Sequence, residues 1–459
     1  MLPSKYKAPI AYGTHEPWPP ALVGWYVVLV LTCANTVSLI DRQVLSLLVE
    51  EIRADWGLND TQISLLQGAA FVIFYTLAGL PIARLADSRN RKIIIIVGIG
   101  IWSAMTAICG LAKSYWYLFL ARIGVGVGEA SLSPSAYSMV ADYFPPNKLA
   151  FPLGVFATGI AAGMGLALLA GGYVIDMAIK KGPADWPIVG VLQPWQSVFI
   201  VVGMIGIIPV GLMCTIKEPS RRSGDPINTG KHASVPVREM FKFFRTNWRA
   251  YATIVGGFTL TAVTAYGILS WTPAFYMRSF GLTASEAGYF IGLVIIASGL
   301  IGSFAGGMAA DVLERRGVTN GKVVVLLVAC GGVIVPGVAA PLMPNVNLAL
   351  VFLFLSFLFG QAMVGPLTSA IQVITPNRMR AQAGALYLVI VNFFGLTVGP
   401  TSVALITDYV FKDPMDLRYS LVIVNGVANV LGFILIALGL KPYRRVVEKI
   451  SRTPNNKVS

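Results

Sequence analysis

The sequence predicts an all-α membrane protein in which twelve transmembrane helices form two pseudo-symmetric halves of six helices each. The 459 residues are 56% apolar and only 12% charged, whereas a soluble protein carries roughly 25% charged residues. Twelve apolar segments reach the spanning length of about 20 residues. A short charged motif recurs at the same place in the first six and in the last six of these segments.

Each of the twelve segments is expected to be a helix, because a backbone in lipid must satisfy its hydrogen bonds internally. The strands of a membrane barrel would alternate apolar and polar residues, and these segments do not alternate for long. In chain order, the predicted spans are residues 22–48, 62–83, 92–112, 115–141, 151–176, 196–216, 250–276, 285–310, 322–343, 347–372, 383–408 and 419–440.

The basic residues predict the orientation of these spans. Of the 35 Lys and Arg residues, 26 fall on the side of the two termini and 7 on the other side, while Arg42 and Arg122 lie inside spans. Cytoplasmic loops carry the excess of Lys and Arg. We therefore expect a multi-pass protein of the plasma (inner) membrane with both termini in the cytoplasm. The net charge of +14 follows from this topology and requires no nucleic-acid partner.

The longest polar connection divides the chain in the middle. We expect an N-terminal six-helix half over residues 1–216 and a C-terminal six-helix half over residues 250–441. Residues 217–249 would form a cytoplasmic linker and residues 442–459 a cytoplasmic tail. Aromatic and basic residues alternate from Val237 to Arg249, which is typical of an interfacial amphipathic helix.

The two halves repeat one another. Asp87 follows the second span and Asp311 follows the eighth, 224 residues later. Asp176 ends the fifth span and Asp408 ends the eleventh, 232 residues later. A repeat of this period with six spans per copy indicates a duplication with parallel halves.

The loop after the second span identifies a family. Residues 83–92 read Ala-Arg-Leu-Ala-Asp-Ser-Arg-Asn-Arg-Lys, which resembles the signature loop of the major facilitator superfamily. Ser88 stands where the family has a basic residue, and Asn90 stands where it has glycine. The second copy keeps Gly307 and Asp311 and is weaker. The resemblance covers essentially the whole chain and implies the major facilitator fold.

Two further stretches resemble the spinster-like branch of that superfamily. One is Ile-Asp-Arg at residues 40–42, and the other is the run from Arg122 through three alternate glycines to Glu129 and Pro134. The Ala-Asp-Tyr-Phe-Pro-Pro stretch at residues 141–146 fits the same branch. This resemblance implies an amphiphilic lipid substrate, such as a lysolipid or a sphingolipid-like molecule that carries phosphate, and transport coupled to protons.

Four charged residues lie deep inside the apolar segments. They are Asp41 and Arg42 in the first span and Arg122 and Glu129 in the fourth. A charge at such depth costs about 2.5–3.5 kcal/mol on insertion scales, so it usually faces a protein interior or an aqueous pathway. At a rise of 1.5 Å per residue, Asp41, Arg42 and Arg122 are expected at one depth, with Glu129 near the bilayer centre.

These four residues are the candidates for the transport chemistry. We expect Asp41 and Glu129 to bind and release protons, because burial and a nearby guanidinium have opposite effects on the pKa of a carboxylate. Arg42 is the candidate for an anionic headgroup, since guanidinium binds phosphate bidentately, and Arg122 is expected to pair with an acid. Arg122 and Glu129 are also assigned to the substrate site. The alternative is a static ion-pair network between the first and fourth spans.

The second half contributes polar residues without deep charges. Tyr266, Gln361 and Asn392 are expected to contact the substrate from the seventh, tenth and eleventh spans. Ordinary hydrogen bonding between helices is the alternative role for each of them. A cavity that is charged on one wall and apolar and aromatic on the other would suit an amphiphile.

Asp87, Arg91 and Asp311 are assigned to gating. Asp87 would cap the N-terminus of the eleventh span across the cytoplasmic face, where the helix dipole is positive. Breaking this contact would accompany inward opening. The alternative is a solvated turn that only follows the positive-inside rule.

The predicted function is secondary active transport by alternating access. The runner-up is an exchanger or symporter of small organic anions, such as sugar phosphates or carboxylates. A membrane-embedded enzyme is disfavoured because His15 and His232 lie in polar stretches and no phosphate-binding loop is present, and a scaffold without transport would not need the deep charges. We expect no cofactor and no metal, and a monomer that interacts with protons, membrane lipids and its substrate.

Overall fold

The computed structural model describes residues 18–145, 148–186, 190–221, 237–376 and 379–452. These residues are helical almost throughout, with one two-stranded hairpin. The helices before the linker are α1 (Ala21–Leu47), α2 (Val49–Trp56), α3 (Asp60–Gln67), α4 (Ala69–Ser88), α5 (Arg91–Cys109), α6 (Tyr115–Glu129), α7 (Leu132–Tyr143), α8 (Ala150–Lys181), α9 (Pro194–Ile205) and α10 (Ile207–Thr215). Strands β1 (Ala184–Trp186) and β2 (Gly190–Leu192) pair antiparallel between α8 and α9.

The second half follows a linker helix. The helices are α11 (Val237–Thr246), α12 (Trp248–Phe280), α13 (Ala284–Arg315), α14 (Gly321–Ala339), α15 (Val346–Ala362), α16 (Val364–Ile374), α17 (Arg380–Leu405) and α18 (Leu417–Arg452). A π-helical turn, Ile406–Phe411, continues α17. The last helix extends to Arg452, well past residue 440, where the sequence analysis ends the final span.

Eleven helices in the described part of the chain are long and apolar enough to cross a membrane. The remaining predicted span, residues 115–141, is divided into α6 and α7, which follow one another with a break at Ala130 and Ser131. The all-α class with twelve spans in two halves is thus confirmed. Local sequence sets several helix starts, because Asn59 and Thr283 form capping boxes with the residues three positions on and so satisfy free N–H groups.

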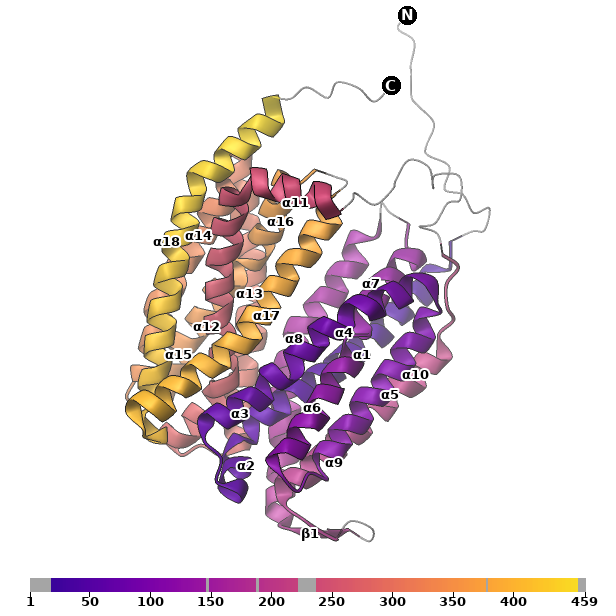
Figure 1. Ribbon diagram of the computed structural model, residues 1–459, viewed down its shortest axis with the longest axis vertical. Helices are drawn as coiled ribbons and strands as arrows, with labels where there is room; N and C mark the ends of the chain where they lie inside the picture. The colour runs from indigo at the N-terminus through magenta and orange to yellow at the C-terminus, as the bar shows by residue number, and fades with distance from the viewer. Residues whose placement is uncertain (1–17, 146–147, 187–189, 222–236, 377–378, 453–459) are drawn as a thin grey trace, which may run out of the picture.

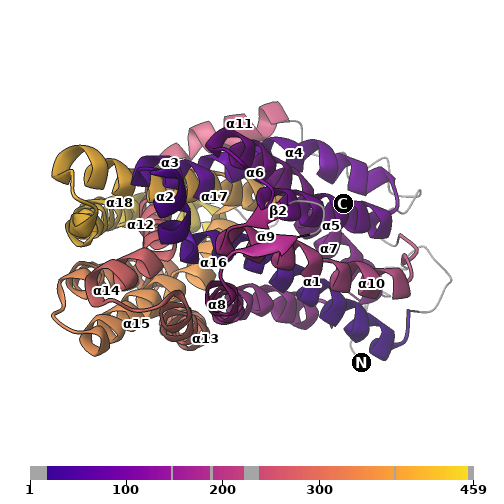
Figure 2. The same ribbon diagram turned by 90° about the horizontal axis from the view of Figure 1, so that it is seen from below.

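The molecule has two faces that matter for function. We call the face that carries α11 and the start of α12 the linker face, and the face that carries Arg278, Asp60 and Asp408 the opposite face. Figure 1 shows the ribbons of the two halves close together near α3 and the lower end of α17, and spread apart toward the linker face. Seen along the helices in Figure 2, α8 lies beside α13 and α17 beside α3 and α4, where the halves meet.

The glycines of the fourth span let neighbouring helices approach its backbone closely. A Cβ at Gly126 would lie 2.4 Å from the carbonyl oxygen of Phe71 on α4, and one at Gly128 would lie 2.6 Å from the amide nitrogen of Trp102 on α5. No side chain fits at such distances. The glycine run therefore allows α4 to pack against the charged end of α6.

Candidate functional site: a buried ion pair of the N-terminal half

Glu129, at the end of α6, is tied to α1 by its carboxylate. Both Nε and Nη2 of Arg42 lie 2.6 Å from Oε2, and the Ser38 hydroxyl donates to the same oxygen at 2.9 Å. Glu129 is buried, and its second oxygen, Oε1, has no hydrogen-bond partner among the described residues. One oxygen of this carboxylate is therefore bound by Arg42 and Ser38, and the other is buried with no hydrogen-bond partner among the described residues.

Asp41 and Arg122 lie next to this pair and are also buried. The Arg122 guanidinium donates from Nη1 to the backbone oxygen of Asp41 at 3.3 Å and from Nε to the backbone oxygen of Leu66 at 3.4 Å. Oδ1 of Asp41 has no hydrogen-bond partner among the residues described. Arg122, Glu129 and Arg42 are the charged groups around the Asp41 carboxylate.

This geometry corrects one expectation. Arg122 was expected to be the arginine that pairs with an acid, and this is wrong for the conformation seen here, in which Arg42 forms the ion pair with Glu129. The reason lies in the angular positions of the residues on α1. Arg42 follows Ser38 by one helical turn, so both side chains point to the same carboxylate, whereas Arg122 reaches the α1 backbone instead.

Arg42 is the member of the cluster that reaches open space. Its side chain is 25% exposed, whereas that of Glu129 is fully buried. The guanidinium carbon lies 4.5 Å from the ring centroid of Phe71 and 5.2 Å from that of Tyr75. Phe71 also lies 5.8 Å below the guanidinium of Arg122. The two rings hold Arg42 in place through cation–π contacts without neutralising it.

The second half supplies the facing wall. The Tyr266 hydroxyl on α12 donates to Oδ1 of Asn392 on α17 at 2.9 Å, and Tyr266 interacts electrostatically with Arg42 across the two halves. Gln361 and Tyr266 line one cavity of 170 Å³, whose other walls include Phe258, Phe357 and Val391. The three polar residues predicted for this half are thus brought close to one another, and Tyr266 faces the charged cluster.

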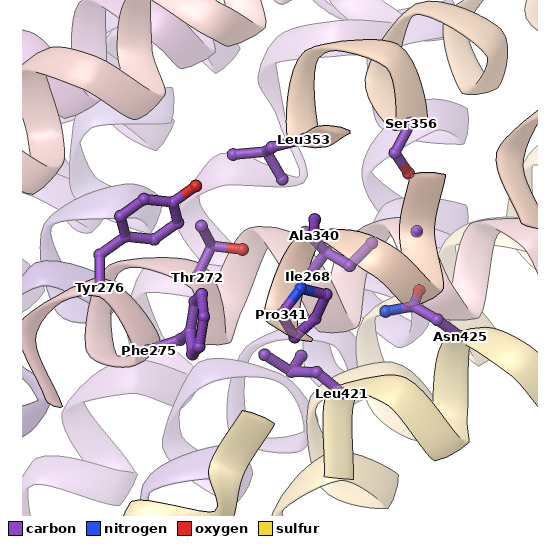
Figure 3. Close-up of a pocket in the computed structure, with 11 residues that line it drawn as sticks. Ile268, Thr272, Phe275, Tyr276, Ala340, Pro341, Leu353, Ser356, Leu421 and Asn425 are labelled. Atoms are coloured by element: carbon purple, nitrogen blue, oxygen red, sulfur yellow. The ribbon is translucent and has the colours of Figure 1, made fainter. Parts of the chain in front are cut away.

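A second, much smaller cavity lies inside the C-terminal half. It measures 20 Å³ and includes Thr272, Tyr276, Ser356 and Asn425 in its lining, as Figure 3 shows. This volume holds about one water molecule, so the cavity is too small for a substrate. It shares Ile268 and Ser356 with the larger cavity.

Charged residues lock the two halves together at the opposite face. Arg278, at the end of α12, donates bidentately to Asp60 at 2.7 and 2.8 Å and to Glu50 at 2.7 Å. Asp408 of the π turn accepts from the backbone N–H of Asp60 at 3.2 Å and from that of Thr61 at 2.6 Å. We call these five residues the clamp. An aspartate of one half capping a helix of the other half is the contact expected for Asp87, but here it occurs at the opposite face.

The predicted gating residues lie at the linker face. Arg91 is buried and donates to Asp142 at 2.5 Å and to Glu218 at 2.7 Å, so it joins α5 to α7 and to the segment after α10. Asp87 is exposed at the end of α4, and its backbone oxygen accepts from Arg221. Asp311 is exposed on α13, and Lys322 lies near it.

Sequence reasoning missed two groups of residues. Ser38 and Arg42 are four positions apart, and so are Phe71 and Tyr75. Residues at this spacing are neighbours on a helix surface, so the sequence contained a signal for both pairs. The clamp carried a weaker signal. Arg278 is one of few basic residues on its side of the membrane, but nothing in the sequence pairs it with residues more than 200 positions away.

Known proteins resemble this chain over most of its length. The model of the Major Facilitator Superfamily matches residues 31–400. An MFS-type efflux pump of Mycolicibacterium smegmatis is 28% identical, over 93% of this chain and 95% of its own. The sphingosine-1-phosphate transporter SPNS2 of Mus musculus is 28% identical, over 54% of this chain and 43% of its own. A bacterial homolog of the human lysosomal transporter Spinster, solved in an inward-facing and unoccupied conformation, has a TM-score of 0.75 at 27% identity and covers 94% of this chain and 98% of its own. The chain therefore belongs to the major facilitator superfamily of membrane transporters, beside the spinster proteins.

Proposed function

We propose that this transporter is secondary active, works by alternating access and couples an amphiphilic, phosphate-bearing substrate to protons. The observation that carries the proposal is the Arg42–Glu129 ion pair. It joins a buried carboxylate with an unused oxygen to a partly exposed guanidinium that faces the second half. A proton can therefore bind the carboxylate of this pair, and a substrate anion can bind its guanidinium.

The coupling follows from charge balance. A proton on Oε1 of Glu129 neutralises the carboxylate and removes its attraction for Arg42. The freed guanidinium then offers two parallel N–H donors to a phosphate. Asp41, with Oδ1 unpartnered among the residues described, provides a second place for a proton beside the same guanidinium groups.

The arrangement of the halves supports alternating access. The clamp closes the opposite face, while the ribbons diverge toward the linker face (Figure 1). We place the linker face on the cytoplasmic side of the plasma membrane, because this face carries the excess of basic residues. The conformation is then inward-facing, as is the Spinster homolog it resembles, and transport requires the clamp to break.

An amphiphile fits the two unlike walls. Arg42 belongs to the N-terminal half, and the 170 Å³ cavity beside Tyr266 is mostly apolar, with Tyr266 and Gln361 among its few polar residues. The resemblance to a sphingosine-1-phosphate transporter supports the same class of substrate. A small organic anion would be favoured by a free arginine on each wall, but Arg278 of the second half is already bound in the clamp.

The test is uptake into proteoliposomes with an imposed pH gradient. The probes are a labelled lysophosphatidate, a monoacylglycerol without phosphate and glucose 6-phosphate. We expect gradient-driven uptake of the lysophosphatidate alone. Glu129→Gln and Asp41→Asn should abolish the response to the gradient, whereas Glu239→Gln, at an exposed carboxylate of α11, should leave it unchanged.

Two results would overturn parts of this proposal. An unchanged gradient response in both carboxylate variants would remove the proton role. Uptake of glucose 6-phosphate in preference to the lysophosphatidate would replace the amphiphile by a small organic anion.

A further inference from the structure

A groove of 530 Å³ lies outside the site described above, at the linker face of the second half. It runs between α12 and α17, with α16 behind it and α11 above it. Its lining is Phe244, Arg245, Trp248, Tyr251, Ala252, Val255, Gly256, Ile371, Ala383, Leu386, Tyr387 and Ile390. Figure 2 places α11 at the rim of the molecule, and the exposed Trp248, Ala252 and Leu386 show that the groove opens to the surface.

The interior of this groove is suited to hydrocarbon. Its two tyrosine hydroxyls are already bound within the protein, Tyr251 to Thr375 at 2.6 Å and Tyr387 to Thr368 at 3.0 Å. They therefore do not require a polar ligand. Apart from Arg245 and the indole N–H of Trp248, the remaining lining is aliphatic or aromatic, and a volume of this size lies within the usual range of about 300–1,000 Å³ for ligand pockets.

The roof of the groove is basic. Arg245 lines the groove from α11 and is exposed, and Lys242 and Arg249 are exposed on either side of it. No acidic partner of Arg245 occurs among the described residues. Trp248 at the rim is 57% exposed and Leu386 is 39% exposed, which is the amphipathic character of a membrane interface.

A second groove of 400 Å³ provides an internal comparison. It lies between α13, α14 and α15 and is lined only by glycine and apolar side chains, among them Gly306, Val328 and Phe359. Val328 is 64% exposed, so this groove also opens outward. Its lining is apolar and contains no basic residue.

We propose that the groove beneath α11 binds an anionic phospholipid of the leaflet at the linker face, with one acyl chain between α12 and α17 and the phosphate at Arg245. Charge complementarity identifies the occupant, because the roof carries three exposed cations and the interior offers no polar contact to a headgroup. The site is distinct from the central ion pair and does not use Arg42. It does not rest on the proposed transport function.

The experiment uses the full chain purified in detergent and a phosphatidylglycerol that carries a diazirine on one acyl chain. After illumination, the labelled peptides are mapped. We expect label on residues 248–256 and 383–390. Since one basic residue near an anionic lipid accounts for about a fivefold difference in binding, Arg245→Gln should reduce this labelling about fivefold at low probe concentration.

Matched variants separate this groove from other sites. Ala252→Phe fills the groove and should abolish the labelling. Arg316→Gln changes an exposed cation of the linker face that is not part of the roof, and Val328→Phe fills the second groove, so both should retain the labelling. A phosphatidylcholine probe with the same diazirine should label these peptides about fivefold less.

Three outcomes would overturn the proposal. Equal labelling by the two lipids would remove the role of the basic roof. Labelling that persists in Ala252→Phe would place the chain elsewhere. Labelling that is lost in Arg42→Gln but kept in Ala252→Phe would assign the lipid to the central site instead.

Discussion

At the scale of single residues, the charged cluster is asymmetric in its exposure and its partners. Oε2 of Glu129 accepts from Arg42 and Ser38, and Oε1 accepts from no described residue. A buried pair of this kind contributes little net stability while both partners are present, yet removing one partner leaves an uncompensated charge.

A double-mutant cycle tests whether this pair is coupled. Arg42→Gln should destabilise the protein by about 3–5 kcal/mol, because a buried carboxylate loses its counter-charge. Adding Glu129→Gln to the same chain should recover most of that loss. The measurement is the unfolding equilibrium of the purified protein in detergent. A double variant as unstable as Arg42→Gln alone would show that the two side chains are not coupled.

The sequence predicted a common level for Asp41 and Arg122 but not the partners of the charged groups. The rise per residue of a helix placed Asp41, Arg42 and Arg122 at one level, and the contact of Arg122 with the Asp41 backbone agrees with this. The choice between Arg42 and Arg122 as the partner of Glu129 depends on how α1 and α6 are rotated about their axes. That rotation is set by tertiary packing, which a single sequence does not specify.

At the scale of elements, the fourth span shows how glycine positions the chemistry. The backbone of α6 lies against Phe71 on α4 because Gly126 has no side chain. The same contact places the Phe71 ring beneath Arg42. The packing of α6 on α4 therefore also determines where the guanidinium lies.

Two glycine substitutions test this packing. Gly126→Ala should destabilise the protein by about 1–3 kcal/mol, because its Cβ would lie 2.4 Å from a backbone oxygen of α4 and overpacking carries this cost. Gly79→Ala is the matched control on α4, where a Cβ meets nothing within 4 Å. It should keep or raise the thermal unfolding midpoint. Equal midpoints for the two variants would contradict the packing argument.

At the scale of the whole molecule, the clamp holds the halves together on one side. Its residues come from α2, α3, α12 and the π turn after α17. The twelve spans and the duplication were predictable from hydropathy and from the recurring motif. The clamp was not, because its residues lie at the ends of elements from different halves, and local patterning contains no information on such contacts.

Breaking the clamp should change the balance of conformations. Arg278→Gln removes the charge that binds Asp60 and Glu50, so the opposite face should open more often. Spin labels at Lys113→Cys and Pro344→Cys, both exposed near that face, should move apart in pulsed electron resonance measurements. Labels at Lys148→Cys and Arg316→Cys on the linker face should approach one another. Unaltered distances for both label pairs would show that Arg278 does not hold this state.

The rings beside Arg42 have a consequence for selectivity among lipids. A quaternary ammonium, such as that of choline, is usually held by the faces of aromatic rings. Here the faces of Phe71 and Tyr75 are already covered by a guanidinium, which also repels a second cation. A zwitterionic choline lipid therefore gains no binding energy from these rings. The contacts that orient the arginine thus also disfavour binding of a choline lipid.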